Sequence, residues 1–382
     1  MKQVIKGFKF RLYPNKLQEE LINKTIGCSR FVANFVIAQQ NKKENIWSAT
    51  NDLVQKGMLT KNNYKSSYFN KYDAVKDIPL LKKHYAWLKE VDSIALQASV
   101  ENVGDAYKRF YEKIAKKPKF KSKKNPVQSY TTKSVNGNIE VFDKHIKLPK
   151  LGLVRYANSK KVDGKIKKAT IRRNPSGKYY ISLLVETTVE PLPKTNSTIG
   201  IDVGLKNFAI LSNGKVYENP KFFRSMEEKL ARAQRILSRR KEGSSNWYKQ
   251  KVKVARIHEK ITSARKDYLQ KISTEIIKNH DMIGLEDLKV SNMIRNHNLA
   301  KAITEVSWYE FRTMLKYKAE WYEKQVILVD PKHTSQRCNA CGHVEKANRK
   351  SQSAFVCLKC GHTDNADANA SKNIEERALA VS

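Results

Sequence analysis

Acidic side chains are scarce in this chain of 382 residues. Asp and Glu number 37 against 74 Lys and Arg, which gives a formal net charge of +37. An excess of one sign spread over the whole chain predicts a polyanionic partner, and nucleic acid is the first candidate. An anionic membrane surface is the weaker alternative.

Long apolar runs are absent as well. No stretch of about 18 apolar residues exists, which excludes a membrane-spanning helix. The first residues, MKQVIKG, lack the apolar core of a secretory signal. Hydrophobic residues still make up 40% of the chain and aromatic residues 9%, which excludes wholesale disorder. We therefore expect a folded intracellular protein of several domains, each roughly 100–200 residues long.

Cysteine is rare, and its distribution is informative. Only five cysteines occur, and Cys28 stands apart from the other four. Cys338 and Cys341 form one C-x2-C pair, and Cys357 and Cys360 form a second. Four thiolates in this pattern are typical of a closed tetrahedral zinc site, so we expect one structural Zn²⁺. Buried or redox-active thiols are the alternative.

Three carboxylates are associated with apolar segments that lie far apart in the sequence. Asp202 and Glu286 each end an apolar strand pattern, and Asp367 opens a predicted helix after the cysteines. A charge at the end of a buried strand is costly unless it binds something. Carboxylates that converge from different elements can hold Mg²⁺ or Mn²⁺ for phosphodiester hydrolysis. Each one alone could instead be a turn or cap residue, and the competing acids are Asp287, Asp330 and Asp364.

Hydrophobic patterns divide the chain into regions. An alternating strand at 4–13 precedes helical patterns, with a polar loop predicted at 59–71. Short alternating runs with turn pairs between 116 and 187 predict a small antiparallel sheet or barrel, completed by the N-terminal strand. A linker at 187–197 then leads to hairpin, helix, strand, helix and strand patterns, which suit a mixed α/β sheet.

Basic residues form tracts that include aromatic side chains. The tract 108–124 contains nine Lys and Arg against one Glu, and others occupy 160–173 and the helical patterns at 224–266. Such tracts suit phosphate binding with base stacking, although any one of them could be a solvated face. The candidate nucleic-acid contacts are Tyr13, Gln97, Lys119, Phe120, Lys121, Lys123, Arg239 and Arg240.

Longer motifs in this chain resemble the TnpB (OrfB) family of transposon-encoded proteins, relatives of type V CRISPR effectors. The C-terminal motifs are GIDVGLKNFA at 200–209, GLEDL at 284–288, VDPKHTSQRCNACG at 329–342 and DANASKNI at 367–374. The N-terminal motifs are RLYP at 11–14, GCSRFVAN at 27–34, WLK at 87–89, SIALQ at 93–97 and PKFKS at 118–122. The third acidic motif lacks the common Asp-x-Asp form and reads Asn365-Ala366-Asp367, which retains Asp367.

The resemblance implies an RNA-guided endonuclease that cleaves double-stranded DNA beside a short flanking motif by two-metal hydrolysis. It implies an α/β multidomain fold with a RuvC-like (RNase H-type) nuclease, a zinc-finger insertion, a small β-barrel wedge and a helical recognition domain. By motif match Asp202, Glu286 and Asp367 are the catalytic residues. The expected boundaries are 1–14 and 116–190 for the wedge, 15–115 for recognition, 198–333 and 364–382 for the nuclease, and 334–363 for the zinc finger.

The implied partners are a guide RNA derived from the transposon end and a DNA duplex, with one protein chain per RNA. The implied location is the cytoplasm of a bacterial or archaeal cell, at the nucleoid. Two other functions remain open at this point. One is a nuclease-dead regulator that binds DNA through its guide, and the other is a transposase acting directly on transposon ends.

Overall fold

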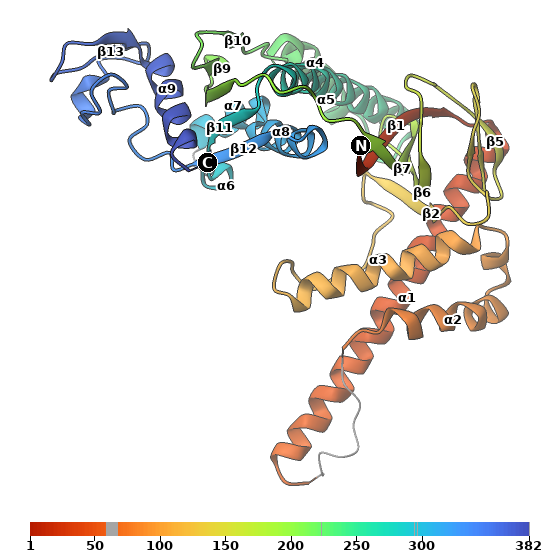
Figure 1. The fold of residues 1–382 in the computed structure, drawn as a ribbon. Helices are drawn as coiled ribbons and strands as arrows, with labels where there is room; N and C mark the ends of the chain where they lie inside the picture. Colours follow the sequence, from red (N-terminus) through yellow and green to blue (C-terminus); the bar gives the residue numbers. More distant parts are fainter. Residues whose placement is uncertain (59–67, 223, 294, 296, 382) are drawn as a thin grey trace. The chain divides into compact units, whose positions relative to one another are not determined.

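The structure is a computed structural model that describes residues 1–58, 68–222, 224–293, 295 and 297–381. The chain divides into two compact units, residues 5–187 and residues 1–4 with 188–382, here called the N-terminal and C-terminal units (Figure 1). Residues 59–67 of the predicted polar loop lie outside the described residues.

A seven-stranded sheet is the centre of the N-terminal unit, with strand order β2-β6-β7-β1-β5-β4-β3. Its strands are β1 (Lys2–Tyr13), β2 (Gln128–Lys133), β3 (Glu140–Val141), β4 (His145–Leu148), β5 (Gly152–Tyr156), β6 (Lys165–Arg173) and β7 (Tyr179–Val189). β1 lies between β7 and β5, so the N-terminal strand completes the sheet as predicted. β2 and β3 are the two edges of this order, so the hydrogen bonding follows an open sheet and not the closed barrel that the resemblance implied.

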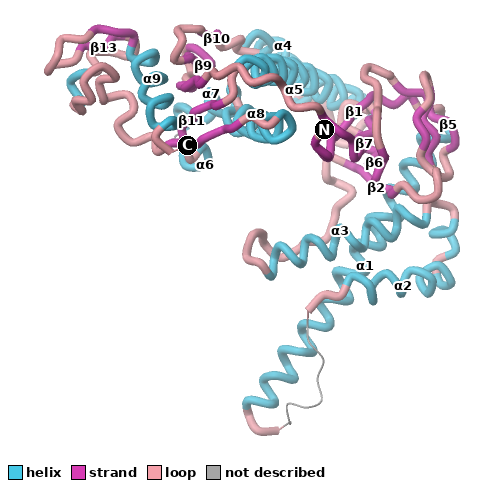
Figure 2. Tube along the Cα trace, in the orientation of Figure 1, coloured by secondary structure: helices cyan, strands magenta, loops and turns pink. Residues whose placement is uncertain are grey.

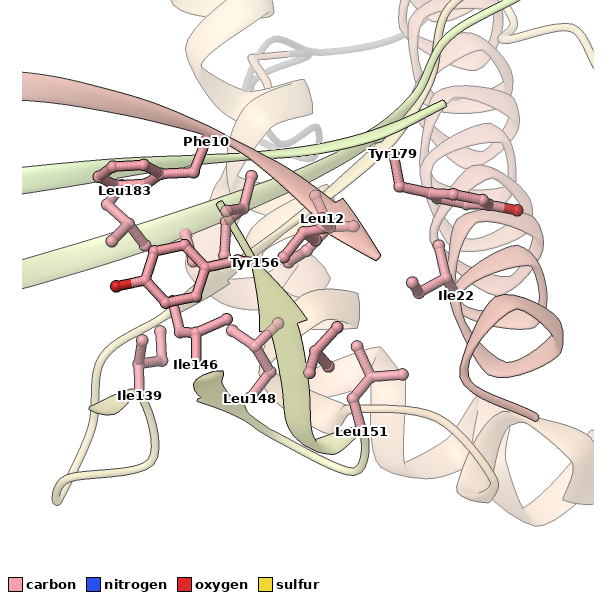
Figure 3. Packing of buried hydrophobic residues seen from close by; sticks show 14 of the residues in the cluster. Phe10, Leu12, Ile22, Ile139, Ile146, Leu148, Leu151, Tyr156, Tyr179 and Leu183 are labelled. Carbon is pink, nitrogen blue, oxygen red and sulfur yellow. The ribbon is translucent and has the colours of Figure 1, made fainter. Parts of the chain in front are cut away.

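Alternation along the strands produces the core of this sheet. Phe10 and Leu12 point to the same face and are buried, as are Ile181 and Leu183 on β7. Figure 3 shows this core, to which Ile22 contributes from the first helix. Successive strand residues face opposite sides, so the intervening positions carry the polar and basic side chains.

Three long helices make up the rest of the N-terminal unit: α1 (Lys16–Gln55), α2 (Lys71–His84) and α3 (Ser93–Tyr111), with the short turn η2 (Ala86–Lys89) between the last two. Asn15 caps α1 in a capping box with Gln18, which explains why the helix begins directly after Pro14. Buried residues of all three helices form a second core around Val32, Leu88 and Leu96. α2 was not predicted, and it contains Pro79 in its interior.

A five-stranded sheet of order β10-β9-β8-β11-β12 is the centre of the C-terminal unit (Figure 2). The strands are β8 (Thr198–Val203), β9 (Asn207–Leu211), β10 (Val216–Glu218), β11 (Met282–Glu286) and β12 (Gln325–Val329). The helices are α4 (Arg224–Ser238), α5 (Ser245–Asn279), α6 (Val290–Met293), α7 (His297–Val306), α8 (Trp308–Tyr322) and α9 (Ala366–Leu379). β8, β11 and β12 are parallel neighbours, and β8, β9 and β10 form an antiparallel meander that contains the predicted hairpin.

The predicted linker at 187–197 is only partly irregular. β7 continues through Val189, and the carboxylate of Asp281 accepts hydrogen bonds from the backbone N–H groups of Thr195 and Asn196, at 2.8 and 2.7 Å. The end of the linker is therefore fixed to the start of β11. Across the described parts of the chain, no helix is both long enough and apolar enough to cross a membrane.

Candidate active site and cysteine cluster

Asp202 and Glu286 lie at the carboxyl ends of neighbouring parallel strands. The register pairs Ile201 of β8 with Leu285 of β11, so the next residues, Asp202 and Glu286, reach the same edge of the sheet together. Both side chains are half-buried. The carboxyl edge of a parallel sheet is where ligands of open α/β folds bind. The two acids that sequence patterns selected are thus neighbours in the fold.

Paired glycines allow α9 to pack directly on these strands. Gly200 and Gly284 are register partners on β8 and β11. A Cβ at Gly200 would lie 2.0 Å from the carbonyl oxygen of Ser371, and a Cβ at Gly284 would lie 3.0 Å from that of Ile374. Only glycine permits so close an approach of helix backbone to strand. The glycine two residues before Asp202 and the glycine two residues before Glu286 therefore position the helix that carries the third acid.

Asp367 lies in the first turn of α9. The side chain of Asn365 caps this helix by accepting hydrogen bonds from the N–H groups of Asp367 and Ala368. Asp364, one of the competing acids, pairs with Lys372 at 2.8 Å. An acid in the first turn is favoured by the positive end of the helix dipole. The Asn365-Ala366-Asp367 form of the motif is thus a helix start.

Arg349 is the cation that pairs with Asp367, and sequence reasoning did not select it. Its Nη2 donates to Oδ1 of Asp367 at 2.8 Å and to the carbonyl of Gln352 at 3.0 Å. Both members of the ion pair are mostly buried, at 28% and 23% side-chain exposure. Arg349 occurs in none of the quoted motifs, and only its position between the two cysteine pairs could have drawn attention to it.

The three carboxylates interact electrostatically. Desolvation by burial raises the pKa of Asp202 well above its usual range, and the neighbouring charges of Glu286 and Asp367 raise it further. Arg349 opposes this shift. Burial also raises the pKa of Glu286, while a hydrogen bond from Thr334 lowers it. Two neighbouring carboxylates with raised pKa values, Asp202 and Glu286, are a recognised signature of a functional site.

Glu286 has a dedicated hydrogen-bond donor. The hydroxyl of Thr334 donates to Oε1 of Glu286 at 2.5 Å, and Thr334 itself is buried with 3% exposure. Thr334 follows β12 in the VDPKHT segment, so the loop after the neighbouring strand orients the carboxylate. The three carboxylates offer oxygen ligands only, which suits Mg²⁺ or Mn²⁺. Among the described residues, however, only the cysteines already form a ligand group within 4.8 Å.

The cysteine cluster has the geometry of a zinc site. The sulfurs of Cys338, Cys341, Cys357 and Cys360 all lie within 4.8 Å of one another. The Cys338–Cys360 and Cys341–Cys357 sulfur distances are 3.7 and 3.6 Å. A tetrahedral zinc with bonds of about 2.3 Å separates its sulfur ligands by about 3.8 Å. The four residues therefore fit Zn²⁺ and leave no position open for substrate.

Two asparagines of the last motif, Asn369 and Asn373, join this cluster to α9. The carboxamide of Asn369 accepts from the N–H of Asn339 and donates to the carbonyl of Arg337, at 3.0 and 2.8 Å. Asn373 donates to the carbonyls of Thr334 and Arg337 at 3.0 and 2.6 Å. Both asparagines are fully buried. The asparagines of the DANASKNI motif thus attach the cysteine segment to the helix that carries Asp367.

The candidate nucleic-acid contacts are exposed in every case. Tyr13 lies at the end of β1 and Gln97 on α3, while Lys119, Phe120, Lys121 and Lys123 belong to the loop before β2, and Arg239 and Arg240 follow α4. Tyr13 belongs to a row of cations and rings. The guanidinium of Arg11 lies 5.5 Å from the ring of Tyr13 and 5.4 Å from that of Tyr180, and Arg155 lies 5.2 Å from Tyr13. Such a row suits base stacking.

Nearly the whole sequence of this chain is similar to those of other proteins. The chain is 38% identical to the Escherichia coli K12 protein named "Putative RNA-guided DNA endonuclease InsQ", over 99% of this chain and 93% of that protein. It is 32% identical to a Streptomyces pristinaespiralis protein named "Putative RNA-guided DNA endonuclease", covering 100% and 91%. Residues 181–297 match the OrfB_IS605 family model, described as "Probable transposase". The chain belongs to the OrfB (TnpB) family.

Two further models match parts of this TnpB-family chain. Residues 308–374, which include the cysteine cluster, match the Cas12f1-like TNB domain. Residues 1–44 match a model described as a helix-turn-helix domain. In the structure that segment is strand β1 followed by the uninterrupted helix α1. The matched sequence therefore forms a strand and a single helix here.

The fold of this TnpB-family protein is also found in a CRISPR effector. A solved structure, "Cryo-EM structure of the Cas12f1-sgRNA-target DNA complex", matches with a TM-score of 0.53 and 13% identity, over 98% of this chain and 99% of that one. At this identity the likeness concerns the fold alone. The mixed α/β architecture of this chain is thus shared with that Cas12f1 chain.

Proposed function

We propose that this protein is an RNA-guided DNA endonuclease that cleaves double-stranded DNA, with Asp202, Glu286 and Asp367 as its catalytic residues. The observation that carries the proposal is the register of β8 and β11, which brings Asp202 and Glu286 to one sheet edge beneath α9. The names of the family relatives, which describe RNA-guided DNA endonucleases, support it. All three acids are present, which favours a nuclease over the nuclease-dead alternative.

Asp202, Glu286 and Asp367 would hold Mg²⁺ or Mn²⁺. When bound, these ions supply an activated water and stabilise the leaving 3′ oxygen in phosphodiester hydrolysis. The oxygen-only donor set supports a cation site, as does the pKa of Asp202, which burial and then the charges of Glu286 and Asp367 raise. The four cysteines would hold one structural Zn²⁺.

Two other side chains have roles in this proposal. Thr334 fixes the orientation of the Glu286 carboxylate through its hydroxyl. Arg349 compensates the charge of Asp367 in the free protein. A guanidinium released from Asp367 can donate two hydrogen bonds to the phosphate of a bound strand. Arg349 would then bind substrate at the point where the carboxylates act.

The N-terminal unit would bind the nucleic acids that direct cleavage. In this proposal the helical region 15–115 and the sheet region 116–190 hold the guide RNA, derived from the transposon end, and read a short motif beside the DNA target. The basic loop before β2 and the Arg11–Tyr13–Arg155 row support a nucleic-acid role for these regions. The remaining regions, 198–333 and 364–382, would form the nuclease, interrupted by the zinc finger at 334–363.

The test is cleavage by the chain purified with its co-expressed guide RNA. A linear DNA duplex matching the guide, with randomised flanks, is incubated with Mg²⁺, Mn²⁺, Ca²⁺ or EDTA. We expect cleavage with Mg²⁺ or Mn²⁺, little with Ca²⁺ and none with EDTA. Asp202→Ala should abolish cleavage but retain the RNA and bind the target. Asp287→Ala is the matched control, because Asp287 is paired with Arg312 at 2.6 Å outside the carboxylate site.

Cleavage by the Asp202→Ala protein at the rate of the unaltered chain would refute the assignment of the active site. Sequencing of the bound RNA addresses the partner separately. A protein that carries no defined RNA yet cuts transposon-end DNA would instead be the directly acting transposase.

A further inference from the structure

A polar pocket lies between helix α1 and the loop 116–127, entirely within the N-terminal unit. It consists of two cavities of about 300 and 440 Å³, and Ile26, Arg30 and Gln128 line both of them. Cavities of this size accommodate a nucleotide or a molecule of similar size. We call it the α1–loop pocket.

The loop wall of the pocket is held in a fixed position. Asn34 of α1 donates to the carbonyl of Lys121 at 2.9 Å and accepts from the N–H of Lys121 at 2.7 Å. Arg30 donates to Oε1 of the buried Gln128 at 2.9 Å, and Nε2 of Gln128 donates to the carbonyl of Asn125 at 2.7 Å. The side chain of Asn34 therefore fixes the backbone of the loop at Lys121 to α1, and Arg30 joins the helix to Gln128.

The pocket has an excess of positive charge. Arg30, Lys121, Lys123 and Arg173 line it, and none of the four forms an ion pair with a carboxylate in the part of the chain that the structure describes. The acid at its rim, Glu20, is 3.6 Å from Lys24. Although the side chain of Lys121 keeps an exposed part, desolvation by the atoms around its ammonium group lowers its pKa. An anion would compensate this charge.

The two guanidinium groups have donors to spare. Arg30 donates through Nη1 to Gln128, and Arg173 donates through Nη1 to Oδ1 of Asn23 at 2.7 Å. A guanidinium has five N–H donors, so each arginine retains a pair for a planar or tetrahedral oxyanion. The existing hydrogen bonds hold both side chains at the pocket before any ligand arrives.

Ser29 supplies an independent observation. It lines the pocket, has 4% exposure, and its hydroxyl has no hydrogen-bond partner among the described residues. One turn earlier, Thr25 bonds its hydroxyl to the carbonyl of Leu21 at 2.7 Å, but Ser29 makes no such bond. A buried hydroxyl without a partner is costly, and a ligand in the pocket would satisfy it.

We infer that the α1–loop pocket binds a phosphodiester group of a nucleic-acid strand together with its nucleotide. Phosphate oxygens would accept hydrogen bonds from the free donors of Arg30 and Arg173 and from the hydroxyl of Ser29. Lys121 and Lys123 add charge around them. The inference rests on the proposed function only in taking nucleic acid as the partner, and both RNA and DNA supply this chemistry.

The test measures binding by the full chain carrying Asp202→Ala, so that no probe is cleaved. The probes are a fluorescent 30-nucleotide RNA, the same sequence as single-stranded DNA, and its duplex, each titrated at several salt concentrations by anisotropy. Ser29→Ala should weaken binding of at least one probe by about tenfold, the loss of a hydrogen bond to a charged group. Its free chain should melt at the same or a higher temperature, because an unsatisfied group has been removed.

Arg173→Gln provides the charge test, with Lys83→Gln as its control. Lys83 is exposed on α2 and does not line the pocket, so Lys83→Gln removes the same charge elsewhere on the unit. Arg173→Gln should reduce the slope of log Kd against log salt by about one for the strand that occupies the pocket, and Lys83→Gln should not. The probe that responds identifies RNA or DNA as the occupant.

The inference is overturned if Ser29→Ala lowers the melting temperature and leaves every probe bound as before. It is also overturned if Arg173→Gln and Lys83→Gln are indistinguishable with all three probes. Neither result depends on catalysis. Failure of the proposed nuclease would be seen separately, as cleavage by a protein with Asp202→Ala.

Discussion

The cysteine cluster and the carboxylate site both contact the start of α9, but they are assembled in different ways. The four cysteines come from one segment of 23 residues, and their sulfurs already lie within 4.8 Å of one another. The three carboxylates come from β8, β11 and α9, which are separated by 84 and 81 residues. Local turns can therefore build the first site, whereas only the packing of the sheet and α9 builds the second.

The two sites also differ in how the charge of their ligand atoms is balanced. The thiol ligands form a closed tetrahedral set that fits one ion and excludes solvent ligands. Burial and then the repulsion from the other two carboxylates raise the pKa of Asp202, and Arg349 compensates part of that charge. A closed metal site stabilises the fold. An open site lowers the free energy of unfolding, because its charges stay unmatched until a ligand binds. Each of the following changes tests one side of this contrast.

The largest effect is expected from removing a zinc ligand. Cys357→Ser should abolish zinc binding and unfold the segment 334–363, because metal binding to such a site is worth on the order of 10 kcal/mol of folding free energy. Elemental analysis and limited proteolysis measure the two consequences. Cys28→Ala is the control, since Cys28 lies in the helical core of the N-terminal unit, and it should retain one zinc per chain. One equivalent of zinc in Cys357→Ser would contradict the assignment.

Gly200→Ala should disrupt the carboxylate site and leave the cysteine cluster intact. The new Cβ would lie 2.0 Å from a backbone oxygen of α9, so the helix must move, at a cost of roughly 3 kcal/mol. Cleavage should be lost as Asp367 shifts, while the zinc content stays at one per chain. Gly27→Ala in α1, where no atom lies within 4 Å, should instead raise stability by about 1 kcal/mol. Full cleavage by Gly200→Ala would show that the close approach of α9 is unnecessary.

Asp281 anchors the strand that carries Glu286. Hydrogen bonds from the buried Lys324 and, to a lesser extent, from the N–H groups of Asn196 and Thr195 together lower the pKa of Asp281 to about 2, although desolvation opposes this shift. Asp281→Asn should cost about 2 kcal/mol at pH 7, less than breaking a fully buried pair. Asp267→Asn, which breaks an exposed pair with Lys271, should cost under about 0.5 kcal/mol.

The pH dependence of the Asp281 effect has a definite sign. Because its folded pKa lies below the unfolded value of about 3.9, the stabilisation is complete above that value. It is lost as the pH falls from about 4 toward about 2. Denaturant titrations at pH 7 and pH 3 should therefore show that the unaltered chain and Asp281→Asn differ less in free energy of unfolding at pH 3. A difference that grows on acidification would contradict the ion pair.

The smallest effect concerns the repulsion in the carboxylate site. Asp202→Asn should stabilise the protein by about 1 kcal/mol in EDTA at neutral pH, because a carboxylate whose folded pKa is raised destabilises the fold once it ionises. Mg²⁺ should raise the melting temperature of the unaltered chain more than that of Asp202→Asn. Asp287→Asn, outside the site, should not be stabilised. A melting temperature lowered by Asp202→Asn in EDTA would mean that the carboxylate is a structural hydrogen-bonding group.

Much of the architecture follows from local patterns. The alternation at β1 and β7, the helical spacing of α3 and α5, and the two C-x2-C pairs all predict elements that the structure contains. The reason is that strand alternation, helix periodicity and cysteine knuckles involve residues close in sequence. The helix α2 escaped prediction because Pro79 lies in its interior and its apolar face is short.

Two features of the carboxylate site were not accessible to pattern reasoning. Arg349 reaches Asp367 only because the asparagines of α9 bind the cysteine segment to that helix. Thr334 meets Glu286 because β12 is the parallel neighbour of β11, which brings the loop after one strand beside the end of the other. Neither partner has a local signature, since an arginine in a basic chain and a threonine in a loop are ordinary.

By itself, then, the amino-acid sequence determined the basic character of the protein, the zinc ligands and the acids that end strands, because charge and spacing are properties of the chain. Tertiary structure alone decided which acids meet and which cation opposes them. It also decided that Ser29, Arg30 and Arg173 surround one pocket. The physical reason is that strand register and the contact of α9 with two glycines join residues far apart in sequence, and no local preference encodes those distances.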